Sequence, residues 1–428
     1  MRRTVQSSVA FLLLLIGVLV PATAGADDLV YVRAGTLIDV QSGELLRDQV
    51  ITIRGERVES VGAAQNVKVA EGATVIDLGD AFVLPGLIDM HDHLTSDHRY
   101  HGYKGLEFSV PRQTLFGVNN ARKTLNAGFT TVRNVGASGY ADVALRDAIN
   151  DGEIDGPRLR VSGPSLGITG GHCDSNLLPA EYDERSDGVA DGPWAVRTKV
   201  RENIKYGADV IKFCATGGVL SKGDSVGGPQ YTLEEMQAIV DEAHMHGRRV
   251  AAHAHGAVGI KRAIRAGVDS IEHASLIDDE GIALAKEHGT YLVMDVYNDT
   301  YILEHGASVG MLEESLEKER MIGQLQRDNH KKAFEAGVKM AFGSDGAVYP
   351  HGDNGKQFAY MVEYGMSPMQ ALQAATIRAA DLLGWPDDVG AIAPGFYADI
   401  IALDRNPLED ISAMEHVRFV MKGGKVYK

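Results

Sequence analysis

The sequence contains very little cysteine: there are two in 428 residues, Cys173 and Cys214, and no CxxC motif. So few cysteines exclude a fold built on a disulfide framework and a zinc site built from cysteine pairs. Each cysteine lies within two residues of a candidate site residue described below, so the two can approach one another. We expect reduced thiols there, acting as small hydrophobic groups, rather than a disulfide bond.

Blocks of basic residues are also missing. The chain has 42 Lys and Arg against 58 Asp and Glu, which gives a formal net charge of −16, and the acidic residues are dispersed. Nucleic acids and anionic membrane surfaces are recognised through clustered positive charge. Neither is therefore an expected partner, and the acidity is expected to serve solubility.

One long hydrophobic run is present, "VAFLLLLIGVLV" at residues 9–20, and it follows Arg2 and Arg3. The run is shorter than the roughly 20 residues that span a bilayer. A positive start, an apolar core and the small residues of "PATAGA" predict a secretory signal over residues 1–26, cleaved after Ala24 or Ala26. An uncleaved anchor is the alternative. A cleaved signal would leave the protein in the periplasm or the medium without a membrane anchor. Removal of Arg2 and Arg3 would change the formal net charge from −16 to −18.

Strand-like segments lie at both ends of the mature chain. Residues 29–62 and 74–84 read as short strands broken by turns such as "QSGE" and "IRGER", and strands return in "GAIAPGFYADIIALD" and "VRFVMKGGKVYK". The long middle of the chain has a different hydrophobic pattern. We therefore predict one small β-sandwich domain assembled from residues 27–84 and 389–428.

The middle of the chain alternates helices and strands. Four helix-like segments end in a glycine and pass into an apolar strand, as in "IKYGADVIKFCAT" and "FEAGVKMAFGSD". Strands separated by helices indicate parallel βαβ units. Eight such strands predict a (β/α)8 barrel over residues 85–388. A doubly wound sheet is the alternative, but no GxGxxG motif follows the first strand. The expected strands are 84–91, 130–136, 158–163, 208–215, 249–254, 269–273, 291–296 and 339–344.

Ionisable residues recur at the carboxyl ends of these strands, the face on which barrel active sites are built. A lone histidine on an apolar strand is more often a core residue, but five strands that each deliver a ligand type to one rim predict a metal site. Two histidines spaced by one residue project to the same face of a strand. The residues concerned are His91, His93, Lys212, His253, His255, His273 and Asp345.

The order of these residues resembles the ligand pattern of the amidohydrolase superfamily, in its binuclear-metal subtype. That pattern has HxH on strand 1, Lys on strand 4, His on strands 5 and 6 and Asp on strand 8. The resemblance covers the mature chain, including the "PGLIDMHDH" segment. It implies two divalent metals, usually zinc, with His91, His93 and Asp345 at one and His253 and His273 at the other. Lys212 would be carbamylated and bridge them. A bridging hydroxide would attack the amide, while Asp345 moves its proton to the leaving nitrogen. An ion-paired lysine is the alternative for Lys212.

Finer motifs resemble the Xaa-Pro dipeptidase and metallocarboxypeptidase branch, also called imidazolonepropionase-like, with ochratoxin-hydrolysing enzymes nearby. They are "ITGGHCD", "KFCATGGVLSKGD" and "HAHG". By this resemblance His172 donates a hydrogen bond to the scissile carbonyl and Tyr231 contacts the substrate carboxylate. His255 is assigned to substrate contact, with a role as ligand or as partner of a ligand left open. The alternatives are that His172 is an ordinary loop histidine and that Tyr231 is a tyrosine at the start of a helix, neither with a role in binding.

The resemblance implies an exported enzyme that cleaves an amide beside a free C-terminal amino acid, in dipeptides, N-acyl amino acids or ochratoxin-like amides. It also implies a homo-oligomer. A lactonase or cyclic-amide hydrolase on the same metals is the alternative, and a non-catalytic exported binding protein is a further one. Imidazolonepropionases themselves use one metal and lack the strand-4 lysine.

Overall fold

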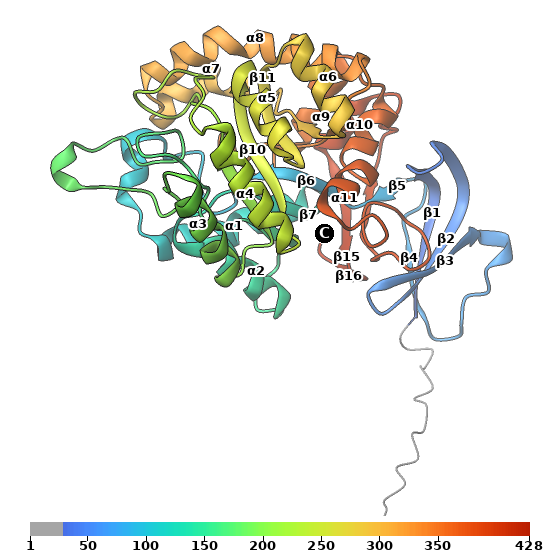
Figure 1. Cartoon of the computed structure of the whole chain (residues 1–428). Coiled ribbons are helices and arrows are strands. Elements are labelled where there is room, and N and C mark those ends of the chain that lie inside the picture. The colour runs from blue at the N-terminus through green and yellow to red at the C-terminus, as the bar shows by residue number, and fades with distance from the viewer. Residues whose placement is uncertain (1–28) are drawn as a thin grey trace, which may run out of the picture.

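The computed structural model describes residues 29–428 and consists of a barrel and a smaller β domain (Figure 1). The predicted signal, residues 1–26, lies outside the described residues. Among those described, no helix combines the length and the hydropathy needed to cross a bilayer.

The small domain is built from both chain ends, as predicted. Its strands join in one sheet of order β16-β15-β14-β5-β1-β2-β3, with β4 paired to β1. Antiparallel pairing of β14 with β5 joins the two chain ends. The strands are β1 (Leu29–Asp39), β2 (Glu44–Arg54), β3 (Arg57–Ala63), β4 (Thr74–Asp77), β5 (Phe82–Pro85), β14 (Ile400–Leu403), β15 (Val417–Lys422) and β16 (Lys425–Val426).

This sheet has a core of its own. Alternate residues of the strands point to one side, so Val32 of β1, Ile51 of β2 and Ile400 of β14 meet in one buried apolar cluster. In Figure 1 the blue N-terminal strands lie to one side of the barrel. No residue of this sheet lines the cavity in which the candidate residues gather.

Eight parallel strands form the barrel, in the predicted order. Three pair as β6-β7-β8 and five as β9 to β13. A parallel bridge between Leu166 and Phe213 joins β8 to β9, and Met90 donates its backbone N–H to Phe342, which joins β13 to β6. The strands are β6 (Leu87–Asp92), β7 (Phe129–Asn134), β8 (Arg158–Val161), β9 (Val210–Cys214), β10 (Arg249–Gly256), β11 (Ser270–Leu276), β12 (Tyr291–Val293) and β13 (Met340–Ala341).

Helices surround the barrel (Figure 1). Two helices begin with a capping box, in which Thr232 and Ser367 each accept a hydrogen bond from the backbone N–H of the third residue of their helix. The helices are α1 (Val110–Asn126), α2 (Ala141–Asn150), α3 (Pro193–Lys205), α4 (Leu233–Met245), α5 (Ala257–Ala266), α6 (Asp279–His288), α7 (Asn298–Val309), α8 (Glu313–Glu335), α9 (Gln357–Glu363), α10 (Pro368–Ala374) and α11 (Ile377–Leu383).

Candidate metal centre

A cavity of about 330 Å³ opens at the carboxyl ends of the barrel strands. Its wall contains all seven side chains that the sequence predicts at this rim, together with His172. They are His91, His93, His172, Lys212, His253, His255, His273 and Asp345. The residues that the period-2 and strand-end arguments singled out therefore lie together in one cavity wall.

Two groups of buried side chains have the geometry to hold a metal ion, and they share His273. One contains His253, His255 and His273, and the other contains His91, His273 and Asp345. Within each group the candidate ligand atoms lie within 4.8 Å of one another. Imidazole nitrogen and carboxylate oxygen are donors that zinc accepts.

His93 completes the second group from the same strand end. Its Nε2 lies 3.3 Å from Asp345 Oδ1, and Nε2 of His91 lies 3.4 Å from that same oxygen. The HxH motif thus delivers both imidazoles to one carboxylate, as expected for residues that share a strand face.

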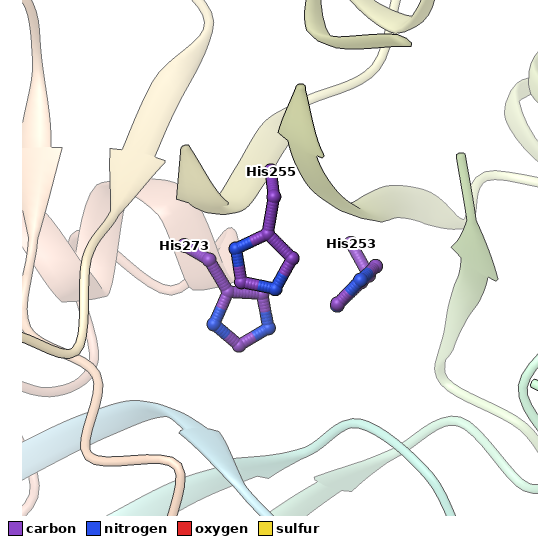
Figure 2. Close-up of side chains that lie close together, drawn as sticks. All are labelled: His253, His255 and His273. Carbon is purple, nitrogen blue, oxygen red and sulfur yellow. The ribbon is translucent and has the colours of Figure 1, made fainter. Parts of the chain in front are cut away.

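Figure 2 shows the two histidines of β10 beside His273, and all three line the cavity. The ring of His255 stacks on that of His273, with centroids 4.9 Å apart and planes 18° apart. The ring of His253 stands edge-on to His273 at 4.7 Å. His255 thus lies among the candidate ligands, and the structure adds weight to the ligand role that the sequence left open.

The backbone is strained where two of these residues sit. His273 has a φ of 70° and Asp345 a φ of 54°, in the left-handed region that non-glycine residues seldom adopt. In β11 this interrupts the strand alternation, so that His273 and its neighbour Glu272 both reach the inside of the barrel. Such strain is common at functional sites, where the surrounding structure holds it in place.

One of the donors, His253, suits a cation in its protonation state as well as its type. Burial holds the pKa of His253 well below its ordinary value, so its imidazole is neutral. Its Nε2 is buried and has no hydrogen-bond partner among residues 29–428. A buried nitrogen lone pair without a partner costs free energy, and a bound cation would remove that cost. The residues therefore fit the metals that the sequence implies.

Lys212 lies in β9 and is 3% exposed. Burial lowers the pKa of its ammonium to about 8. A larger fraction of uncharged amine is therefore available near neutral pH than for a solvent-exposed lysine.

Residues outside the predicted set fix the ligand rings. Nδ1 of His91 lies 3.0 Å from Glu272 Oε2, and Nδ1 of His273 lies 2.8 Å from Asp295 Oδ1. Burial alone would raise the pKa of Glu272, but the charge of Arg133 and the hydrogen bond from His91 hold it well below its usual range. If each Nδ1 donates to its carboxylate, the lone pair of each Nε2 would face a metal.

His172 is held against His253, with ring centroids 4.1 Å apart and planes 19° apart. Its Nδ1 lies 2.8 Å from Ser221 Oγ, and Ser221 is itself bonded to Asp224. A Cβ at Gly218 would overlap the His172 ring, so the glycine there permits this close approach. Burial lowers the pKa of His172 to about 4, so the ring is neutral.

The expectation of reduced thiols is wrong: Cys173 and Cys214 form a disulfide, with Cα atoms 5.9 Å apart. The expected proximity is correct. Both cysteines line the cavity, and the bond ties the loop that carries His172 to the strand that carries Lys212. The sequence could not decide the bond, because pairing requires a Cα separation that spacing along the chain does not give.

Tyr231 is not part of the cavity wall. Its side chain is fully buried, and its hydroxyl donates to the carbonyl of Ala190 at 3.0 Å. Its ring packs edge-on to Phe213. The predicted contact with the substrate carboxylate is therefore withdrawn, since the hydroxyl already has a partner inside the core.

The model of the amidohydrolase family matches residues 82–427. An ochratoxinase of Aspergillus niger is 35% identical over 436 residues, which cover 96% of this chain and 89% of the relative. A solved Xaa-Pro dipeptidase with methionine bound in its active site is 40% identical, with a TM-score of 0.88 and coverage of 94% and 100%. A solved prolidase complexed with N-methylphosphonate-L-proline is 34% identical, with a TM-score of 0.85 and coverage of 93% and 99%.

Proposed function

Because this chain belongs to the amidohydrolase family and is a hydrolase, we propose that it cleaves an amide bond next to a free C-terminal amino acid. The observation that carries the proposal is the buried group of His91, His273 and Asp345 beside His253 and Lys212 in one cavity. Two relatives support this substrate class, because one was solved with methionine bound in its active site and another in complex with a proline derivative. An amino acid with a free carboxylate is thus a product of suitable size.

Two divalent cations, when bound, would acidify a water molecule and polarise the scissile carbonyl. His91, His93 and Asp345 would hold one of them, and His253 and His273 the other, with His255 as a further donor to the second. Lys212 would bridge them as a carbamate, formed when its neutral amine attacks carbon dioxide and loses a proton. A carbamate replaces a positive charge with two oxygen donors, which suits a site of this kind better than an ammonium group.

Asp345 would transfer the proton, and His172 would donate a hydrogen bond to the scissile carbonyl. Asp345 can take a proton at one carboxylate oxygen and return it to the leaving nitrogen. Its Oδ2 accepts from Asn298 at 3.1 Å, which fixes the orientation of the carboxylate. The hydroxyl of Ser221 donates to Asp224 and lies 2.8 Å from Nδ1 of His172. For His172 to donate from Nε2 to the scissile carbonyl, the Ser221 proton would turn from Asp224 to Nδ1.

The free carboxylate would be held by neutral donors. In the described part of the chain no arginine lines the cavity, whereas Ser96, Tyr100 and His101 do. Recognition by hydroxyl and imidazole groups at close range would replace a long-range attraction that a chain of net charge −16 does not supply.

The test compares kcat/KM for an N-acyl amino acid with that for its C-terminal amide in metal-loaded enzyme. We expect the acid to be favoured by about 2–4 kcal/mol of transition-state binding, the scale of a buried charged contact. Equal rates for acid and amide would refute the carboxypeptidase function and favour a general amidase or a lactonase.

We also propose that the enzyme is exported, on the strength of residues 1–26 and of the Cys173–Cys214 bond. Disulfides persist in oxidising compartments such as the periplasm. N-terminal sequencing of the mature protein should find a start at Gly25 or Asp27. An intact Met1 on membrane-bound material would contradict the proposal.

A further inference from the structure

A second cavity, of about 280 Å³, lies at the opposite end of the barrel from the candidate metal centre. Its wall includes Val210 and Arg249, the first residues of β9 and β10. The candidate metal ligands gather instead at the carboxyl ends of the barrel strands. Among residues 29–428 the walls of the two cavities share no residue. The second cavity is therefore a separate candidate for ligand binding.

Arginine dominates the wall of this second cavity. Four guanidinium groups line it, whereas Asp209 is the one acidic residue in the wall within the described range 29–428. Like charges repel one another more strongly when they are partly removed from water. A chain of net charge −16 thus contains a cavity that requires negative charge. The four residues are Arg133, which is buried, and Arg160, Arg248 and Arg249, which are half-buried.

Two of the four positive charges already have partners. Arg133 Nη2 lies 2.7 Å from Glu272 Oε1 inside the barrel. Arg160 Nη1 lies 3.2 Å from Asp209 Oδ1. The carboxylate of Asp209 is shared, because its Oδ2 also accepts from Arg146 at 2.7 Å. The negative charge of Asp209 is therefore fully used by these two arginines.

The other two arginines bind carbonyl groups alone. Arg248 donates from Nε to the carbonyl of Ala208 at 3.0 Å, and Arg249 donates from Nη1 to the carbonyl of Leu382 at 2.9 Å. In the part of the chain that the structure describes, neither guanidinium forms an ion pair or a further hydrogen bond. A guanidinium has several N–H donors, so most donors of both residues remain for a ligand.

Carboxylates outside the wall do not balance these two charges. Asp269 and Asp381 lie near Arg249 in an adjoining cavity. Each has a basic partner of its own, because Asp269 lies 2.9 Å from His244 and Asp381 lies 3.7 Å from Lys339. Two positive charges therefore remain without a counter-charge at the second cavity.

We propose that this second cavity binds a phosphate group, either as inorganic phosphate or in a phosphomonoester. A phosphate carries a charge of about −1.5 to −2 near neutral pH, which matches the two guanidinium groups that lack a carboxylate. A planar guanidinium can also donate to two phosphate oxygens at once. The cavity has room for atoms beyond the phosphate itself, so an ester substituent can enter. This site is independent of the proposed function, since it shares no wall residue with the metal centre.

Equilibrium dialysis of the metal-loaded enzyme with radiolabelled inorganic phosphate tests the site. We expect saturable binding in about 0.15 M sodium chloride, where exposed charges are largely screened. Arg248→Gln and Arg249→Gln should each weaken this binding by about tenfold or more, the low end for losing a partner of a buried charge. Arg262→Gln is the matched control, because Arg262 is a half-buried arginine of α5 outside the cavity. It removes the same charge and should leave the binding intact.

The same variants distinguish this site from the metal centre, which can also attract phosphate. Phosphate held by the metals would remain bound in both Arg248→Gln and Arg249→Gln. Binding that is unchanged in both variants therefore overturns the proposal, and so does the absence of saturable binding in the wild type. A cooperative unfolding transition shows that each variant folds, and either variant alone decides the outcome if the other does not fold.

Competition for the labelled phosphate separates the two sources of the phosphate group. Phenyl phosphate that displaces the label at lower concentration than unlabelled phosphate identifies a phosphomonoester as the ligand. The reverse order identifies inorganic phosphate. Malonate that displaces the label at lower concentration than both would contradict a phosphate site and make the cavity a site for dicarboxylates.

Discussion

Asp295 accepts a hydrogen bond from Nδ1 of His273, with 2.8 Å between the two atoms. The carboxylate is itself held by Gln326, whose Nε2 lies 3.0 Å from the same oxygen. A histidine that donates from Nδ1 must present the lone pair of Nε2, the form that binds a metal. Asp295 thus fixes both the tautomer and the orientation of the residue that the two ligand groups share.

Removal of that carboxylate should weaken metal binding. We expect Asp295→Ala to lower the affinity for zinc about 10–100-fold, the usual cost of losing a partner of a ligating histidine. Competition with a chelator measures the affinity. Glu304→Ala, an exposed change on α7, is the control. Unchanged affinity in Asp295→Ala would show that His273 needs no such support.

His172 should act on the reaction and not on the metals. We expect His172→Asn to lower kcat/KM by about 10²–10³, the cost of losing one donor to a developing oxyanion, with metal content unchanged. His305→Asn, at an exposed histidine of α7, should behave as wild type. A variant that loses metal and activity together would instead make His172 a ligand or a support of one.

Tyr231 should matter for stability alone. Tyr231→Phe removes the hydrogen bond to the Ala190 carbonyl, so the free energy of unfolding should fall by about 0.5–1.5 kcal/mol. The preference for a free carboxylate over its amide should not change. Loss of that preference in the variant, measured from kcat/KM for both substrates, would restore the role that the sequence suggested.

The sequence predicted the features that depend on short-range patterns. His91 and His93 share a strand face, and Lys212 and Asp345 end barrel strands, so their meeting follows from topology. The partners of these residues were missed, because Glu272 and Asp295 reach the ligands through distances and strand irregularities that local spacing does not reveal. Tyr231 was misplaced for the same reason. Its position after a glycine-rich loop suggests access to a ligand, whereas packing against Phe213 decides its burial.

The disulfide should stabilise the fold and the position of His172. Replacing Cys173 and Cys214 together by alanine should cost roughly 2–4 kcal/mol in the free energy of unfolding. Because the bond ties the loop of His172 to β9, kcat should fall more than KM rises. Chemical denaturation and steady-state kinetics measure the two effects. Mass spectrometry of non-reduced peptides checks the bond itself, and two alkylated thiols in the native protein would contradict it.

The central claim, a metal-dependent hydrolase centre bridged by Lys212, is tested most directly by elemental analysis of purified enzyme prepared with zinc and bicarbonate. The account predicts about two metal ions per chain in the wild type and in Lys68→Ala, an exposed lysine of the small domain. Lys212→Ala should lose metal together with activity. Less than one metal per chain in active wild type, or a Lys212→Ala variant that keeps both metal and activity, would contradict it.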